Sequence, residues 1–178
     1  LNKLEQFQSL LSEVDAVIFS DYGKGGLTHV TKMIEAARAA GKVVLVDPKG
    51  DDYSKYQGAT IITPNRSELR QVVGRWKDEA DLTAKAQQLR EDLKLECLLL
   101  TRSEEGMSLF TAQGVEHVKA QAREVYDVSG AGDTVIATMA VALAAKWPAG
   151  QAMKLANKAG GIVVGKLGTA TVSLEELQ

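Results

Sequence analysis

The sequence predicts an α/β protein in which a mostly parallel sheet is covered by helices on both faces. Short apolar runs recur along the chain, and such runs are typical of strands that are buried on both sides. Segments with the apolar spacing of an amphipathic helix separate them. The 178 residues are 45% hydrophobic and 25% charged, a balance that suits one globular domain.

Local spacing justifies each element of the first hundred residues in turn. Helical faces and apolar runs alternate, and Gly41 supplies a stop signal after the second helix. The expected helical faces are Leu4, Phe7 and Leu11; then Val30, Ile34 and Ala37; then Leu82, Ala86, Leu89 and Leu93. The expected strands are 16–19, 43–46, 60–63 and 98–100.

The pattern changes after residue 106. Two strand-like segments, 107–111 and 115–119, flank Gly114, which can adopt the positive φ of a hairpin turn, so we expect an antiparallel edge to the sheet. Segments 131–146 and 151–165 are rich in alanine and glycine, which predicts two closely packed helices with Pro148 between them. An open α/β sheet normally has more strands, so we expect residues 1–178 to be the C-terminal part of a larger domain.

Charge and hydropathy narrow the function classes. The 21 basic and 23 acidic residues give a net charge of −2, which does not favour nucleic acid or an anionic membrane as partner. The sequence has no apolar run long enough to span a bilayer, and the start LNKLEQFQ lacks the order of a signal peptide. We therefore expect a cytoplasmic protein. Its single cysteine, Cys97, lies in an apolar run and is expected in the core.

The strongest local signal is the run DVSGAGDT at 127–134, just before an expected helix. Gly130, Ala131 and Gly132 let the backbone approach a ligand closely, and the free amides of a helix start attract phosphate. Asp133, in the first helical turn, could accept a proton from a hydroxyl that attacks a phosphoryl group. The residues also fit a glycine turn with a helix-capping aspartate, and the sequence alone leaves both interpretations open.

The second signal is the run NRSE at 65–68, after the third expected strand. Asn65 followed three residues later by Glu68 is close to a capping box, which explains the run without any ligand. The functional interpretation is that both side chains, at the carboxyl edge of the sheet, organise nucleotide phosphates and magnesium.

Polar residues follow the other expected strands as well. They are DPK at 47–49, TRS at 101–103 and SDYGKG at 20–25. Any one of them could be a turn with solvated charges, but the carboxyl ends of parallel strands meet at one rim. We therefore expect these segments to lie together with Asn65.

These motifs resemble a known family. DVSGAGDT is similar to the second signature of the ribokinase-type (PfkB) carbohydrate kinases, and NRSE is similar to the N-x-x-E motif of that family. Within the family, the chain looks most like the heptose 7-phosphate kinase domains of bifunctional ADP-heptose synthases. The segments that carry this likeness are SDYGKG, VDPKG, TPNRSE, TRSEEGMSL, EVYDVSGAGDT and VVGKLGTATVS.

The resemblance implies a ribokinase-like fold and an activity. The reaction would be ATP-dependent phosphorylation of D-glycero-β-D-manno-heptose 7-phosphate at C1, giving the 1,7-bisphosphate for ADP-heptose and lipopolysaccharide core biosynthesis. ATP and Mg²⁺ would be the cofactors, and the full-length protein would be a cytoplasmic homodimer.

The resemblance also implies roles for individual residues. Asp133 would be the catalytic base, and Glu68 would contact the metal. The implied nucleotide contacts are Asn65, Arg66, Ser67, Glu68, Thr101, Arg102, Ser103, Gly130, Ala131, Gly132 and, near the nucleobase, Asn157.

Two departures keep other functions open. Thr138 stands where the family signature prefers alanine or glycine, and the chain is shorter than a complete kinase domain of the family. The missing N-terminal part of such a domain carries most sugar contacts. The chain could therefore be a noncatalytic nucleotide-binding fragment, or part of a kinase for another sugar phosphate such as a fructose or tagatose phosphate.

Overall fold

The computed structural model describes residues 3–21, 29–120, 131–164 and 173–177. In chain order its helices and strands are α1 (Lys3–Leu10), β1 (Ala16–Ser20), α2 (Val30–Ala39), β2 (Val43–Asp47), β3 (Ile61–Ile62), α3 (Arg66–Val73), α4 (Glu79–Asp92), β4 (Cys97–Thr101), β5 (Met107–Thr111), β6 (Gly114–Val118), α5 (Ala131–Ala144), α6 (Ala149–Val164) and α7 (Leu174–Leu177). Short 3₁₀ turns occupy Leu11–Glu13, Ser54–Tyr56 and Ser103–Glu105.

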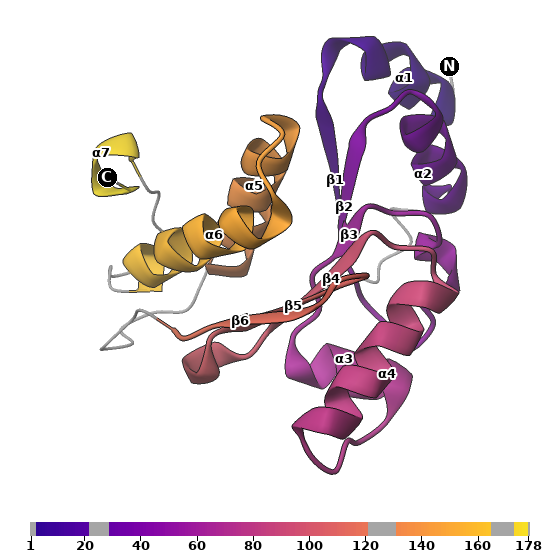
Figure 1. Ribbon diagram of the computed structural model, residues 1–178. Helices are drawn as coiled ribbons and strands as arrows, with labels where there is room; N and C mark the ends of the chain where they lie inside the picture. Colours follow the sequence, from indigo (N-terminus) through magenta and orange to yellow (C-terminus); the bar gives the residue numbers. More distant parts are fainter. Residues whose placement is uncertain (1–2, 22–28, 121–130, 165–172, 178) are drawn as a thin grey trace.

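These elements form three layers, with a six-stranded sheet in the middle (Figure 1). Helices α1 to α4 lie on one face of the sheet, and α5 and α6 lie on the other. The strands are arranged in the order β1 to β6, with β1 to β4 parallel and the β5–β6 hairpin antiparallel to them. The predicted fold class, including the hairpin edge, is confirmed.

Burial on both faces explains why the strands are continuous apolar runs. Along β2, Val44 and Val46 pack into the core under α1 to α4, whereas Leu45 packs into the core under α5 and α6. All three side chains are fully buried. An alternating polar side chain would therefore lose its hydration on whichever face it pointed to.

The two helical layers pack differently. The core beneath α1 to α4 contains large side chains such as Ile34 and Leu69, whereas small residues such as Ala152 and Ala156 let α6 approach α5. A Cβ atom added at Gly160 would lie 3.1 Å from a methyl carbon of Val135 on α5. The alanine and glycine content of these helices is therefore a packing requirement, as the sequence predicted.

Some boundaries differ from those expected. The third strand contains only Ile61 and Ile62, and the hydroxyl of the preceding Thr60 accepts hydrogen bonds from the Val44 amide (2.9 Å) and from Arg38 (2.9 Å). Helix α6 begins directly after Pro148, two residues earlier than expected. The hairpin agrees with the prediction, since Gly114 has a φ of 128°.

Two further expectations concern burial and length. Cys97 is buried in the core on the α5 side, and burial raises the pKa of its thiol to about 12, which keeps it protonated at neutral pH. Within the described parts of the chain, no helix combines the length and apolar character needed to cross a bilayer.

Candidate active site at the carboxyl ends of the parallel strands

The carboxyl ends of β1 to β4 meet at one rim of the sheet. Backbone pairing continues past the strands, since the Asp21 amide donates to the Asp47 carbonyl (3.1 Å) and Asn65 forms a parallel bridge with Thr101. The described parts of the polar segments that follow the four strands therefore lie side by side. Residues 22–25 of the expected segment 20–25 lie outside the described residues.

Helix α3 begins at this rim with a complete capping box. The Asn65 side chain accepts a hydrogen bond from the Glu68 amide (2.8 Å), and Glu68 Oε1 accepts one from the Asn65 amide (3.0 Å). The structural interpretation of NRSE is therefore correct. It does not exclude the functional one, because only one carboxylate oxygen of Glu68 is used by the cap.

The other oxygen of Glu68 pairs with Lys49. The ammonium group hydrogen-bonds Glu68 Oε2 and also lies 3.4 Å from Asp47 Oδ1. Burial alone would lower the pKa of Lys49. The hydrogen bond to Glu68 and the charge of Asp47 outweigh this effect, so the pKa of Lys49 is raised. Lys49 therefore remains an ammonium ion between two carboxyl groups.

The pKa of Asp47 depends on burial and on several charged residues of the rim. Burial raises the pKa of its carboxyl group, the charge of Lys49 opposes this, and the negative charges of Glu68 and Asp133 raise the pKa further. Helix α5 packs against β1 and β2 on the other face of the sheet, and Asp133 in its first turn is one of the charges that act on Asp47.

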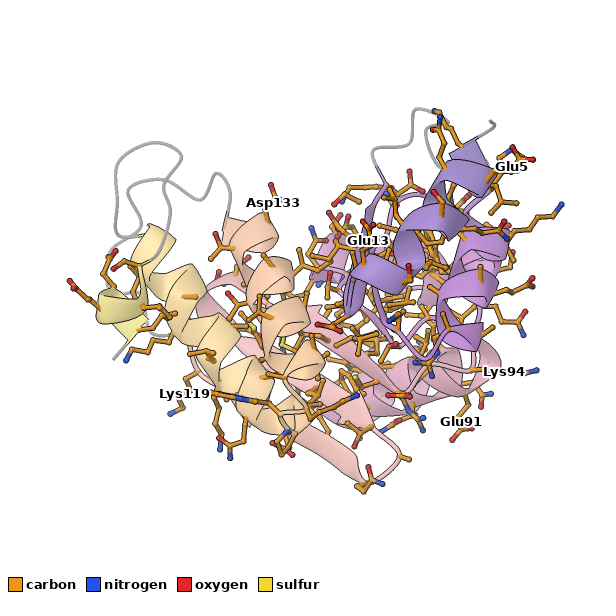
Figure 2. The ribbon with its side chains drawn as sticks, turned by 90° about the horizontal axis from the view of Figure 1, so that it is seen from above. Glu5, Glu13, Glu91, Lys94, Lys119 and Asp133 are labelled. Atoms are coloured by element: carbon orange, nitrogen blue, oxygen red, sulfur yellow. The ribbon has the colours of Figure 1, made fainter. Side chains whose placement is uncertain are left out.

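Asp133 projects from the start of α5 and is exposed, as Figure 2 shows. No hydrogen bond or ion pair joins its carboxylate to any other residue that the structure describes. Gly132 beside it has open space where a Cβ atom would lie. Ala131 is the first residue of the helix, and Gly130 lies outside the described residues.

The loop after β4 is held from both sides. Arg66, in the first turn of α3, pairs with Glu104 (3.5 Å) and Glu105 (3.2 Å). Gly106 has a φ of 91°, and a Cβ atom there would lie 1.9 Å from the Val118 carbonyl oxygen, so only glycine fits. The loop is thus fixed between α3 and the hairpin.

The remaining expected contacts take different positions. Thr101 donates its amide to the Pro64 carbonyl (3.0 Å) at the rim, and Ser67 and Ser103 are exposed. Arg102 is buried on the α4 side, where its guanidinium binds Glu79, Ser108 and Glu105. The hydrogen bond with Glu79 is the largest influence on the Arg102 pKa and raises it despite burial.

Asn157 lies farther along α6 and is buried. Its side-chain nitrogen donates to the Lys119 carbonyl oxygen (2.8 Å), which ties α6 to the end of the hairpin. The described contacts thus give Asn157 and Arg102 structural partners.

Sequence reasoning missed one part of the rim. The Tyr56 hydroxyl donates to Asp21 Oδ2 (2.5 Å) and accepts from the Lys49 amide (3.2 Å), and Lys55 pairs with the same Asp21 oxygen (3.0 Å). Burial is the main reason why the pKa of Tyr56 is raised. The only signal in the sequence is the i, i+3 spacing of Tyr53 and Tyr56, whose rings pack edge to face.

The rim suits a magnesium ion that is shared with phosphates. No cluster of three or more histidine, cysteine, aspartate or glutamate side chains able to hold a metal occurs in the described ranges. Mg²⁺ is usually bound by one or two carboxylates, with waters and substrate phosphates completing its shell. Asp47 and Glu68 provide that number of carboxylates.

The sequence is similar to known bacterial proteins over nearly its whole length. The chain is 59% identical over 167 residues to the D-beta-D-heptose 7-phosphate kinase of Bordetella bronchiseptica, covering 94% of this chain and 53% of that relative. It is 54% identical over 175 residues to the bifunctional protein HldE of Proteus mirabilis, covering 98% of this chain and 37% of that relative. The chain thus spans about half or less of these relatives.

Solved structures show the same fold. The phosphofructokinase-2 of Escherichia coli in complex with potassium matches 99% of this chain and 61% of its own, with a TM-score of 0.83 and 21% identity. The ribokinase of Arabidopsis thaliana complexed with ribose and ATP matches 93% of this chain and 54% of its own, with a TM-score of 0.81 and 20% identity. The family model for pfkB carbohydrate kinases matches residues 1–177. The chain belongs to the pfkB family of carbohydrate kinases.

Proposed function

We propose that residues 1–178 form the nucleotide-binding, base-bearing part of an ATP-dependent kinase that phosphorylates D-glycero-β-D-manno-heptose 7-phosphate at C1. The choice of sugar is supported by the 59% identity to the Bordetella bronchiseptica heptose 7-phosphate kinase. The use of ATP is supported by family membership and by the ribokinase neighbour, which was solved with ATP.

The exposed carboxylate of Asp133 carries this proposal. A carboxylate that stabilised the fold would have partners, but Asp133 has none among the described residues. It lies in the first turn of α5 and acts electrostatically on Asp47, so it belongs to the same rim as Lys49 and Glu68. A base beside a site for phosphates and metal is the arrangement that phosphoryl transfer needs.

In this mechanism, Asp133 accepts the proton of the C1 hydroxyl of the sugar. The hydroxyl oxygen forms a bond to the γ-phosphorus of ATP, and the bond from that phosphorus to the β–γ bridging oxygen breaks, so that ADP leaves with the electron pair. The amides at the start of α5, including those of Gly130, Ala131 and Gly132, donate to the transferring phosphoryl group. Orientation of the two reactants supplies much of the rate.

The opposite side of the rim binds the nucleotide. Asn65, Ser67 and Glu68 offer polar groups at the start of α3, and Thr101 and Ser103 offer them after β4. Glu68, with Asp47, would hold Mg²⁺, which supplies neutralisation of the charge on the β- and γ-phosphates. Arg66 and Arg102 hold the segment after β4 in place through ion pairs with Glu104 and Glu105. Asn157 ties α6 to the end of the hairpin through the Lys119 carbonyl oxygen.

We also propose a cytoplasmic location and a homodimeric full-length protein, as the family resemblance implies. Two other functions remain as outcomes of a test. The chain spans 53% of the Bordetella bronchiseptica relative, which favours a fragment that binds nucleotide without catalysing transfer. A neighbouring structure of phosphofructokinase-2 holds fructose-6-phosphate, which makes that sugar the natural competitor.

A two-stage experiment separates these functions. Calorimetric titration of the chain with a non-hydrolysable ATP analogue and Mg²⁺ tests the nucleotide site. ADP release is then measured for the chain alone and for a fusion that places the preceding part of the Bordetella bronchiseptica relative before it, with heptose 7-phosphate or fructose 6-phosphate as acceptor. We expect nucleotide binding by the chain and a preference of the fusion for the heptose. Absence of nucleotide binding, or a preference for fructose 6-phosphate, would overturn the proposal.

A further inference from the structure

Lys49 occupies the space between the two carboxylates that would hold a metal. Its ammonium group contacts Glu68 Oε2 and lies 3.4 Å from Asp47 Oδ1. The two partners come from different elements, since Asp47 ends β2 and Glu68 lies in the first turn of α3. A cationic side chain therefore bridges this pair of carboxylates.

The backbone of Lys49 is fixed, whereas its side chain is accessible. The Lys49 amide donates to the Tyr56 hydroxyl (3.2 Å), and Tyr56 is fully buried and bonded to Asp21. By contrast, 38% of the Lys49 side chain is exposed, compared with 14% for Glu68. The ammonium group can therefore leave the carboxylates by side-chain rotation, without movement of the strand end.

The charges of the site favour this movement of the Lys49 side chain when a divalent metal ion and nucleotide phosphates bind. Besides Asp21, which pairs with Lys55, the acidic groups Asp47, Glu68 and Asp133 lie at the rim. Lys49 contacts Asp47 and Glu68. A divalent ion competes with the ammonium for the same oxygen atoms. Nucleotide phosphates, in turn, provide a new anionic partner for a displaced lysine.

Resting on the proposed function, we propose that Lys49 is an exchangeable cation that couples metal binding to nucleotide binding. Without nucleotide, its ammonium group holds the carboxylates of Asp47 and Glu68 together and competes with Mg²⁺. When magnesium and nucleotide bind, the metal takes the carboxylates and Lys49 transfers to a phosphate oxygen. The affinity for metal is therefore low without nucleotide and increases when nucleotide binds.

The variant Lys49→Met tests this exchange, because it removes the ammonium group and keeps an unbranched side chain of similar length. We expect two opposite changes. Binding of Mn²⁺ alone, measured by electron paramagnetic resonance, should tighten by about tenfold, since the competing cation is gone. Binding of the ATP analogue in the presence of Mg²⁺ should weaken by about tenfold, since a phosphate partner is gone.

A matched control exists on α4. Lys85 pairs with Asp81 (3.3 Å), and 33% of its side chain is exposed, so its environment is comparable to that of Lys49. Lys85→Met should leave both affinities unchanged. Lys49→Arg, which keeps the charge, should leave Mn²⁺ binding weak.

The outcomes distinguish this inference from the proposed function. If Lys49→Met binds Mn²⁺ no more tightly than the unaltered chain, the exchange is overturned, whatever happens to ATP. If Mn²⁺ binding tightens but nucleotide binding is unaffected, transfer to phosphate is overturned. Failure of the unaltered chain to bind the ATP analogue overturns the proposed function instead. If thermal unfolding shows that Lys49→Met does not fold, Lys49→Gln replaces it in the same measurements.

Discussion

Helices α3 and α5 both begin at the rim of the sheet, yet their first turns are built differently. At α3, Asn65 and Glu68 satisfy each other's backbone amides, and Glu68 also holds Lys49. At α5, Asp133 is exposed and has no bonded partner among the described residues. The α3 start uses its polar side chains to fold, whereas the α5 start presents an exposed carboxylate without a partner in the part of the chain that the structure describes.

The difference shows how one rim can combine stability with reactivity. A side chain that is committed to a cap is held in place and can position a ligand, but its oxygen atoms are partly occupied. A side chain without partners costs the fold little when it is changed and is free to accept a proton. Substitutions at the two helix starts should therefore affect different measurements.

The largest effect is expected from Asp133→Asn. Turnover of the heptose kinase reaction should fall by about 10² to 10⁴-fold, because the general base is lost. Affinity for the ATP analogue should stay nearly the same, and the free energy of unfolding should change by less than about 1 kcal/mol.

Asp81→Asn is the matched control for that variant. Asp81 also lies in the first turn of a helix, but it accepts hydrogen bonds from the Lys77 amide (2.8 Å) and from Lys85. This variant should lose stability and keep its turnover. Near-normal turnover of Asp133→Asn would remove the distinction between the two helix starts.

Gly132→Ala should separate stability from binding at the α5 start. A Cβ atom at this position meets no heavy atom within 4 Å, and alanine is favoured over glycine in a helix by about 1 kcal/mol. We therefore expect a higher melting temperature. The added methyl group would obstruct the approach of a phosphate, so affinity for the ATP analogue should fall by about tenfold. A more stable variant with unchanged affinity would show that phosphate does not approach this turn.

Asn65→Ala, at the α3 start, should lower stability, whereas Gly132→Ala should raise it. Loss of the capping side chain should lower the free energy of unfolding by about 1 kcal/mol, measured by urea denaturation. Asn65→Asp keeps the accepting oxygen and should preserve most of the stability. If Asn65→Ala were as stable as the unaltered chain, the capping box would not be holding α3 in solution.

Much of this arrangement could be predicted from local sequence. Apolar runs predicted the strands because the sheet is buried on both faces, and the i, i+3 spacing of Asn65 and Glu68 predicted the cap that the structure contains. Both signals depend on residues that are close in the chain, so their physical cause is visible without a tertiary structure.

Contacts between distant residues could not be predicted in this way. The hydrogen bond between Tyr56 and Asp21 joins residues 35 positions apart, and it forms only because the β1 and β2 ends are neighbours. The Arg102 side chain lies on the α4 side, where it binds Glu79, a residue 23 positions earlier in the chain. The sequence predicted that Arg102 lies at the rim, but not the direction of its guanidinium.

The smallest expected effect links the two helix starts through Asp47. Burial is the main reason why the pKa of Asp47 is raised above 3.8, and the charge of Asp133 contributes. Asp133→Asn should therefore lower the pKa of Asp47, by a few tenths of a unit if solvent screens the pair as usual. Titration of the carboxyl carbon by nuclear magnetic resonance measures this shift, and Asp81→Asn serves again as the control.

The same shift has a consequence for stability. Because the folded-state pKa of Asp47 exceeds its unfolded value, the folded chain binds this proton more tightly. The free energy of unfolding therefore falls as the pH rises from about 3.8 to the raised pKa. Asp133→Asn should make that loss smaller. An unchanged Asp47 pKa in this variant would mean that the α5 carboxylate does not face the α3 side of the rim, and the two helix starts would then not share one site.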